Sequence, residues 1–215
     1  MRATANRPDT TLTNVAIIDY GLCNLDSIRR AVEECGGIPF VSRDPSDLVG
    51  CDSIILPGVG SFARAMANLH ERGFAEALPR IVIDHGVPLL GICLGMQLLA
   101  STGTEGGETA GLGLLHGRVV RLEPGTEKER IPHMGWNDVT SQNGSALFDG
   151  IEEGTNFYFV HSFRLDSPDA EIHGTVDYCG RTVAAAGRDQ VMGVQFHPEK
   201  SQAAGFRLLK NFLAY

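Results

Sequence analysis

The sequence has little of several features that would each point to a particular class of protein. Its five cysteines include no C-x-x-C pair, so neither a disulfide framework nor a zinc knuckle is indicated. Only 18 Lys and Arg face 26 Asp and Glu, and the net charge of −8 disfavours nucleic-acid binding. No apolar run approaches the roughly 20 residues that span a membrane. We therefore expect a cytoplasmic protein with reduced thiols and with neither a nucleic-acid nor a membrane partner.

What is present is an ordinary globular composition. The 215 residues are 43% hydrophobic and 20% charged, which suits one sizeable domain. The polar start of the chain has no apolar core of a signal peptide. We expect a disordered or frayed tail over residues 1–13 and a single domain over residues 14–215.

Short apolar runs alternate with helical patterns in the first half of the chain, which favours an α/β fold with an open, mainly parallel sheet and helices on both faces. These predicted strands are Val15–Asp19, Ile38–Val41, Ser53–Leu56 and Val87–Ile92, and the helices are Leu25–Cys35, Phe62–Leu69, Phe74–His85 and Leu94–Ala100. Later strand-like segments predict an antiparallel extension: Leu114–Leu122, Asn137–Thr140, Phe157–His161, Ile172–Val176, Val183–Ala186 and Val191–Gln195. Ser201 is placed to cap a last helix, with Phe206, Leu209 and Leu213 on one face.

A candidate nucleophile stands between a predicted strand and a predicted helix. Gly91-Ile92-Cys93-Leu94-Gly95 has the form G-x-C-x-G, the pattern of a nucleophile elbow with Cys in place of Ser. So sharp a turn strains its apex residue and leaves no room for side chains two positions away. The thiol would lie at the carboxyl edge of the sheet, where open α/β sheets bind ligands. A buried structural cysteine is the alternative, and we prefer it for the other four.

A base and its orienting group are predicted after the last strand. In the extended segment His197-Pro198-Glu199, residues two apart project to the same side, so the carboxylate can reach the imidazole. The carboxylate would fix the tautomer, and the other ring nitrogen would face Cys93 and move its proton. Zinc binding is an alternative, but a triad also explains the proline and the elbow. We expect no metal and no cofactor.

An oxyanion hole is predicted beside the elbow. Pro57-Gly58-Val59-Gly60 follows a predicted strand at the same sheet edge, and its glycines let the backbone approach a substrate closely. The N–H of Val59 or Gly60 would join that of Leu94, and one such donor is worth on the order of 3 kcal/mol. A simple strand-terminating turn is an equal alternative.

Together these segments resemble class I glutamine amidotransferases. That family continues its elbow to a glutamine, which Gln97 matches, and ends its triad with H-P-E. More narrowly, residues 14–215 are similar to glutaminase subunits of imidazole glycerol phosphate synthases, most specifically in Pro132-His133-Met134-Gly135-Trp136-Asn137. This resemblance implies a flavodoxin-like, three-layer fold. The chain departs from the family pattern at Cys23, where Gly is usual.

The resemblance also implies which residues bind glutamine and which bind a partner. Gln97 and Glu105 would hold the α-amino and α-carboxylate end of the substrate, although the 103–111 loop offers other positions for the second group. The remaining substrate-binding residues would be Gly58, Gly60, Ser162 and Phe163. The partner would be contacted by Asn24, Trp136, Asn137 and Tyr158, and a core position for Trp136 is an equal alternative.

The activity that the resemblance implies is hydrolysis of glutamine to glutamate and ammonia. Residues 200–215 are too few for an acceptor-binding domain, and free ammonia would be protonated in water. The expected partner is a (β/α)8-barrel cyclase subunit, which forms a heterodimer with this chain. It would use the ammonia to make imidazole glycerol phosphate and aminoimidazole carboxamide ribotide in histidine biosynthesis. We expect little activity without it.

Three alternatives stay open on the sequence. A paralogous glutaminase subunit would feed ammonia to a partner that amidates surface-polysaccharide sugars. A stand-alone cysteine hydrolase would act on peptides or γ-glutamyl compounds by itself. A binding module would keep the fold and have no activity.

Overall fold

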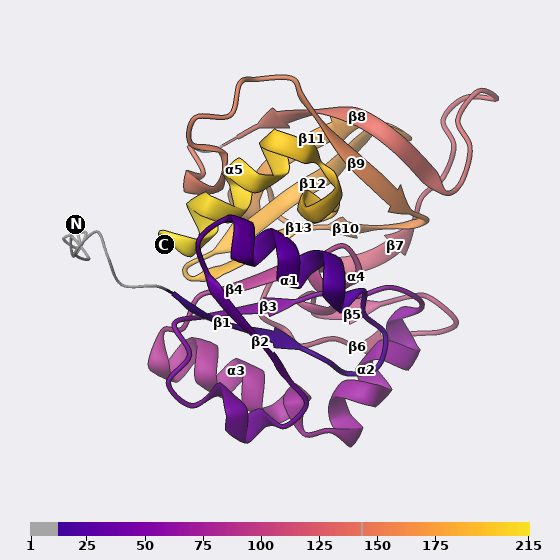
Figure 1. Ribbon diagram of the computed structural model, residues 1–215. Coiled ribbons are helices and arrows are strands. Elements are labelled where there is room, and N and C mark those ends of the chain that lie inside the picture. The colour runs from indigo at the N-terminus through magenta and orange to yellow at the C-terminus, as the bar shows by residue number, and fades with distance from the viewer. Residues whose placement is uncertain (1–12, 143) are drawn as a thin grey trace.

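A nine-stranded mixed sheet forms the centre of the computed structural model, which describes residues 13–142 and 144–215 (Figure 1). The predicted tail lies outside the described residues except for Thr13. The strand order is β2-β1-β3-β4-β13-β12-β11-β8-β9. Its parallel half consists of β1 (Asn14–Ile18), β2 (Ile38–Ser42), β3 (Ser53–Leu56), β4 (Leu89–Ile92) and β13 (Val191–Val194). Its antiparallel half consists of β8 (His133–Ser141), β9 (Thr155–His161), β11 (Ile172–Asp177) and β12 (Arg181–Arg188).

Helices cover both faces of the parallel half (Figure 1). One face carries α1 (Leu25–Glu34) and α5 (Gln202–Leu213), and the other carries α2 (Phe62–Glu71) and α3 (Phe74–His85). The short helix α4 (Leu94–Leu98) follows β4 directly. Every residue of β3 and β4 is buried, as expected for strands covered on two sides. The predicted three-layer α/β fold with an antiparallel extension is therefore confirmed.

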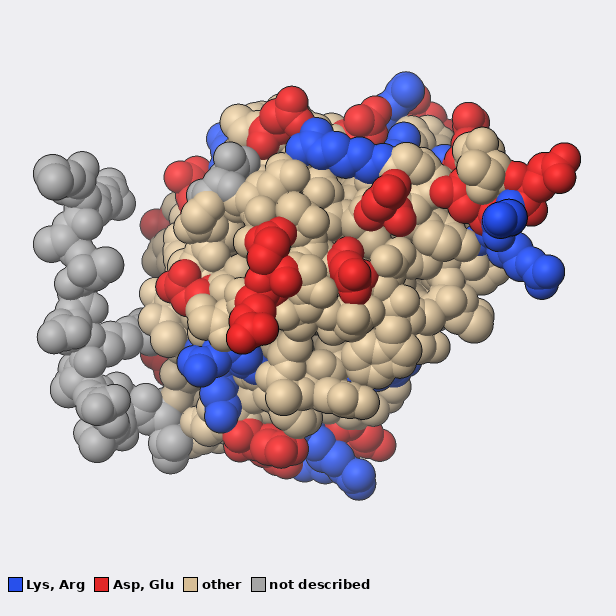
Figure 2. Space-filling model, turned by 90° about the horizontal axis from the view of Figure 1, so that it is seen from above, with Lys and Arg blue, Asp and Glu red and all other residues tan. Residues whose placement is uncertain are grey.

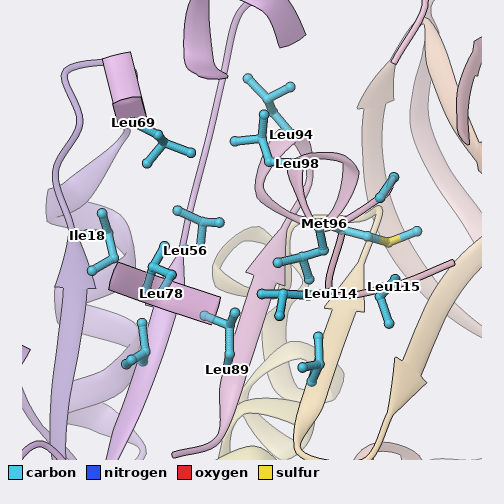
Figure 3. Close-up of a cluster of buried hydrophobic side chains, with 14 of the residues drawn as sticks. Ile18, Leu56, Leu69, Leu78, Leu89, Leu94, Met96, Leu98, Leu114 and Leu115 are labelled. Atoms are coloured by element: carbon cyan, nitrogen blue, oxygen red, sulfur yellow. The ribbon is translucent and has the colours of Figure 1, made fainter. Parts of the chain in front are cut away.

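Two apolar cores hold these layers together, one on each face of the sheet. Figure 3 shows part of the core that lies toward α2, α3 and α4, where Leu69 and Leu78 pack with Ile18 and Leu56 of the strands. The other core joins α1 and α5 to the opposite face and includes Ile17, Val32, Leu90, Ile92, Leu209 and Phe212. Cys93 also packs in this second core. Cys93 is thus anchored in the packed interior.

A second, four-stranded sheet corrects the prediction of one strand over Leu114–Leu122 in the main sheet. Leu114 and Leu115 form a buried turn in which both N–H groups donate to the Leu99 carbonyl, at 2.9 and 2.8 Å. The strand starts only at Arg118 and pairs outside the main sheet. The order is β10-β7-β5-β6, with β5 (Thr102–Gly103), β6 (Thr109–Ala110), β7 (Arg118–Arg121) and β10 (Phe163–Asp166). Two-residue strands are too short to show an alternating pattern.

Ser201 precedes α5 as predicted, but its side chain does not cap the helix. The hydroxyl donates to the His197 carbonyl at 2.6 Å and accepts the Tyr158 N–H at 3.0 Å. The interpretation as a cap is therefore wrong, because the serine instead ties the turn after β13 to β9. On α5 itself the fully buried side chains are Leu208, Leu209 and Phe212.

Candidate active site

Cys93 lies at the apex of the turn from β4 into α4, at the carboxyl end of the parallel strands. Its backbone has φ 55° and ψ −112°, a conformation that residues other than glycine rarely adopt. A Cβ atom on Gly91 would lie 2.7 Å from the Met96 nitrogen, and one on Gly95 would collide with the Leu56 carbonyl oxygen. The predicted need for both glycines is confirmed.

The thiol of Cys93 lies near β9 and near the segment that follows β13, and the residue is 7% exposed. The Sγ atom lies 3.8 Å from the carbonyl oxygen of Val160 in β9 and 3.9 Å from Nε2 of Gln195. Gln195 is not among the site residues expected from the sequence. The rule that places Glu199 beside His197 also predicts the position of Gln195. Residues two apart in an extended segment project to the same side, and Gln195 stands two residues before His197.

The imidazole of His197 is held by Glu199, as predicted. Nδ1 lies 2.8 Å from Oε1, and the two side chains are 5% and 2% exposed. A carboxylate cannot donate, so Nδ1 carries a proton and Nε2 is left for another partner. Nε2 is buried and makes no hydrogen bond within the described part of the chain. The backbone N–H of His197 donates to the Tyr158 carbonyl at 2.9 Å, which fixes the segment to β9.

The side chains of Cys93 and Glu199 both change the pKa of the His197 imidazole. Burial alone would lower the pKa of His197, but its interactions with the side chains of Cys93 and Glu199 outweigh burial and raise the pKa to about 9. The imidazolium is therefore the main form at neutral pH. An imidazolium beside a cysteine stabilises the thiolate, which is the nucleophilic form of that side chain.

Val59 does not present its N–H group to the elbow in this conformation. The N–H donates to the carbonyl of Leu22 at 2.9 Å, so the same hydrogen cannot bind an oxyanion. The segment nevertheless lies beside α4, because a Cβ atom on Gly58 would be 3.0 Å from the Leu94 Cβ. Gly60 has φ +100°, which a residue with a side chain would adopt only under strain.

Gln97 projects from α4 toward β10 and is 5% exposed. Its Nε2 donates to the Phe163 carbonyl at 2.8 Å and to Oε1 of Gln195 at 3.0 Å. Two of the predicted substrate-binding residues, Gln97 and Phe163, are thus in contact. Gln97 also contacts Gln195, the side chain beside the Cys93 thiol. Ser162 precedes β10, and its carbonyl accepts the Leu122 N–H at 2.9 Å.

Glu105 lies at the start of α2, where its Oε2 accepts the Phe62 N–H at 2.7 Å. The first N–H groups of a helix have no partner within the helix, and a carboxylate is favoured there. Glu105 therefore sits just beyond the Pro57–Gly60 segment in space, although 43 positions separate it from Phe62.

Two buried histidines, His133 of β8 and His161 of β9, connect β8 to the Phe163 carbonyl that Gln97 also contacts. Nδ1 of His133 lies 2.9 Å from Nε2 of His161, whose Nδ1 lies 2.9 Å from the Phe163 carbonyl. Nδ2 of Asn137 lies 3.3 Å from Nε2 of His133. Burial lowers the pKa of His133 to about 4 and that of His161 to about 3, so both rings are neutral at pH 7. Each hydrogen bond then points from Asn137 toward Phe163.

The residues predicted to face a partner are partly or largely exposed, on β8 and β9 except for Asn24, which precedes α1. Trp136 is 48% exposed and meets the ring of Tyr158 edge-on at 6.0 Å, so a core position for the tryptophan is wrong. Met134, two residues earlier on β8, is 64% exposed. Asn24 is exposed before α1 and its side chain makes no capping hydrogen bond.

Charges on the face seen in Figure 2 are scattered, with Lys and Arg among Asp and Glu. All five cysteines are free thiols. Within residues 13–142 and 144–215, no group of three His, Cys, Asp or Glu side chains is arranged to hold a metal ion. No helix in those ranges is both long and apolar enough to cross a bilayer.

Known proteins are similar to this chain in sequence and in fold. The family model described as glutamine amidotransferase class-I matches residues 16–214. The imidazole glycerol phosphate synthase subunit HisH of Moorella thermoacetica is 49% identical, covering 92% of this chain and 93% of the relative. The subunit of the same name from Caulobacter vibrioides is 44% identical, covering 95% and 99%. The solved structure of PurLQS from Thermotoga maritima is 20% identical, with a TM-score of 0.74 over 94% of this chain and 98% of that one. It shows the shared fold.

Proposed function

The chain belongs to the class I glutamine amidotransferase family, and we infer that it is the glutaminase subunit of an imidazole glycerol phosphate synthase. One arrangement supports the inference of glutaminase chemistry: Cys93 and His197 follow the parallel neighbours β4 and β13 at one sheet edge, and Glu199 holds the buried His197 imidazole at 2.8 Å. The relatives named as synthase subunits are 44% and 49% identical over more than nine-tenths of the chain, which supports the choice of pathway. We assign this activity to one domain over residues 14–215.

The proposed reaction begins with attack of the Cys93 thiolate on the side-chain amide carbon of glutamine. The His197 imidazolium gives its proton to the departing nitrogen, and ammonia leaves as the C–N bond breaks. The imidazole then takes a proton from water, whose oxygen hydrolyses the glutamyl thioester. The C–S bond breaks, which restores the Cys93 thiolate beside the imidazolium, and glutamate is released after its new carboxyl group gives its proton to solvent. Throughout, Glu199 stabilises the charged form of the imidazole.

We propose that the oxyanion of each tetrahedral intermediate is bound by the N–H of Leu94 and by that of Val59 or Gly60. The hydrogen bond from Val59 to Leu22 means that this hole is incomplete if Val59 is the donor. The peptide must turn before both donors face the substrate. This requirement supports low activity of the isolated chain and a higher activity once a partner favours the turned state.

Glutamine binding is proposed for the groups that surround the thiol. Gln97 and Glu105 would hold the α-amino and α-carboxylate end, with backbone groups of Gly58, Gly60, Ser162 and Phe163 lining the pocket. The contact between Gln97 and the Phe163 carbonyl supports a shared site.

We propose a cyclase subunit of the (β/α)8-barrel type as the partner, in a heterodimer in the cytoplasm. Ammonia loses its nucleophilicity when it is protonated in water. It must therefore pass to the acceptor without being released into bulk solvent. The exposed apolar side chains of Met134 and Trp136 supply a surface for such contacts, together with Tyr158, Asn137 and Asn24. The five free thiols agree with a reducing compartment.

Glutamate release tests this function directly. It is measured for the chain alone, with the cyclase, and with the cyclase plus its phosphorylated aminoimidazole ribotide acceptor. We expect little release alone, much more in the complete mixture, and none from Cys93→Ser in either case. Equal release with and without the cyclase would contradict the proposal. Failure to rescue a histidine auxotroph lacking this subunit would favour the polysaccharide-linked alternative.

A further inference from the structure

The hydroxyl group of Tyr20 is a buried donor that has a weak acceptor beside it, the thiol of Cys23, and no strong one among the described residues. Tyr20 follows β1, its residue is 0% exposed, and its hydroxyl oxygen has no hydrogen-bond partner in the part of the chain that the structure describes. A buried polar group left in this way costs free energy, and a phenylalanine would fill the same space without that cost. The hydroxyl therefore calls for an explanation that packing does not give.

This hydroxyl lies directly against the proposed oxyanion segment. A Cβ atom on Gly58 would collide with it, so only a glycine allows the ring to approach the backbone here. Burial raises the pKa of Tyr20 well above its usual value, and the neighbouring thiols of Cys23 and Cys93 raise it further. The group stays protonated over the working pH range and can only gain by donating its hydrogen.

The peptide between Gly58 and Val59 has an acceptor and a donor on opposite sides. In the present conformation its N–H points to the carbonyl of Leu22, which belongs to the same turn as Tyr20. If the peptide rotates so that the N–H faces the substrate, the Gly58 carbonyl rotates toward that turn. The Leu22 carbonyl cannot donate to it, whereas the tyrosine hydroxyl can.

We propose that Tyr20 is a positioning residue that stabilises the turned state of the oxyanion segment by donating its hydroxyl hydrogen to the Gly58 carbonyl. This role rests on the proposed function. Turning the peptide then exchanges one hydrogen bond, from Val59 to Leu22, for another, from Tyr20 to Gly58. The hydroxyl is unpaired in the resting state and paired in the active one, and this difference favours the active state by about one hydrogen bond.

The test compares Tyr20→Phe with Ser53→Ala in the complex of the full chain with its cyclase. Ser53 is a matched control, because its hydroxyl is also buried without a partner but lies at the opposite end of β3 from Gly58. Glutamate release is measured at several glutamine concentrations, with and without the phosphorylated acceptor. Thermal unfolding of each isolated chain is recorded alongside.

For Tyr20→Phe we expect the ratio of activated to unactivated kcat to fall about fivefold, the effect of one hydrogen bond. The KM for glutamine in the activated complex should stay the same, and the thermal midpoint should be equal to or above that of the wild type. Ser53→Ala should keep the wild-type ratio. A Tyr20→Phe ratio equal to that of a normally activated wild type refutes the role of Tyr20 alone. A wild-type complex without glutamate release refutes the proposed function, and this role with it.

Discussion

Glu199 reaches back across one proline to hold the imidazole of His197, with Oε1 2.8 Å from Nδ1 and both side chains almost completely buried. In this geometry the carboxylate decides which ring nitrogen carries the proton. It also supplies part of the interaction that favours the charged ring over the neutral one. Exchange of its oxygen for an amide nitrogen should therefore disturb both the tautomer and the charge.

Glu199→Gln should lower the kcat of the complex on the order of a thousandfold, because the amide stabilises the imidazolium poorly and permits the wrong tautomer. The KM for glutamine should change little, and steady-state glutamate release separates the two quantities. Glu76→Gln is the matched control, since Glu76 also accepts from a histidine, His70 at 2.8 Å, but on the surface. A kcat for Glu199→Gln within tenfold of the wild type would contradict the triad.

The raised pKa of His197 predicts how stability depends on pH. Its folded pKa of about 9 lies above the ordinary 6.5, so the folded state holds the proton more tightly. This contribution to the free energy of unfolding is complete below pH 6.5 and is lost as the pH rises through about 9. Urea unfolding from pH 6 to 9.5 should show the decline, and His197→Asn, which cannot take up a proton, should show a shallower one. Identical slopes would contradict the interpretation.

Gly95→Ala should destabilise the chain by about 3 kcal/mol or more, because the new methyl group collides with the Leu56 carbonyl, which is backbone and cannot rotate away. Gly125→Ala is the control, since its Cβ would meet only the end of the Glu129 side chain, at 3.4 Å. Chemical denaturation midpoints report both variants. Equal stability of the two would show that the elbow can relax.

Glu105→Gln separates two roles of this carboxylate. The amide oxygen can still accept the Phe62 N–H, so the start of α2 should persist and the thermal midpoint should fall only slightly. The charge that would attract the α-amino group of glutamine is lost, and the KM for glutamine should rise roughly tenfold or more. A KM equal to that of the wild type would limit Glu105 to helix capping.

Local spacing predicts the elements that carry the chemistry. The strand Ser53–Leu56 and the helix Phe74–His85 have the bounds expected from their apolar patterns. The structure also places Cys93 and His197 at one site, because the strands before them are parallel neighbours that end at the same sheet edge. Apolar periodicity, the G-x-C-x-G motif and the H-P-E motif are sufficient to predict these elements and the meeting of the two side chains.

Other parts of the site depend on contacts that spacing does not encode. The Val59 N–H meets Leu22, and Gln195 meets Gln97, only because segments far apart in the sequence fold against each other. The second sheet consists partly of two-residue strands, whose pairing is decided by the surrounding chain. The sequence likewise does not show that Tyr20 places its hydroxyl under Gly58.

The hydrogen bond from Val59 to Leu22 also has a consequence for glutamine consumption in the cell. Glutamine donates nitrogen to many biosynthetic reactions, and an enzyme that cleaved it whenever it met it would waste the supply. With the proposed function, and with Val59 as the oxyanion donor, an unassembled chain that keeps this bond leaves the glutamine pool intact. Surplus copies of the subunit would then cause no futile hydrolysis.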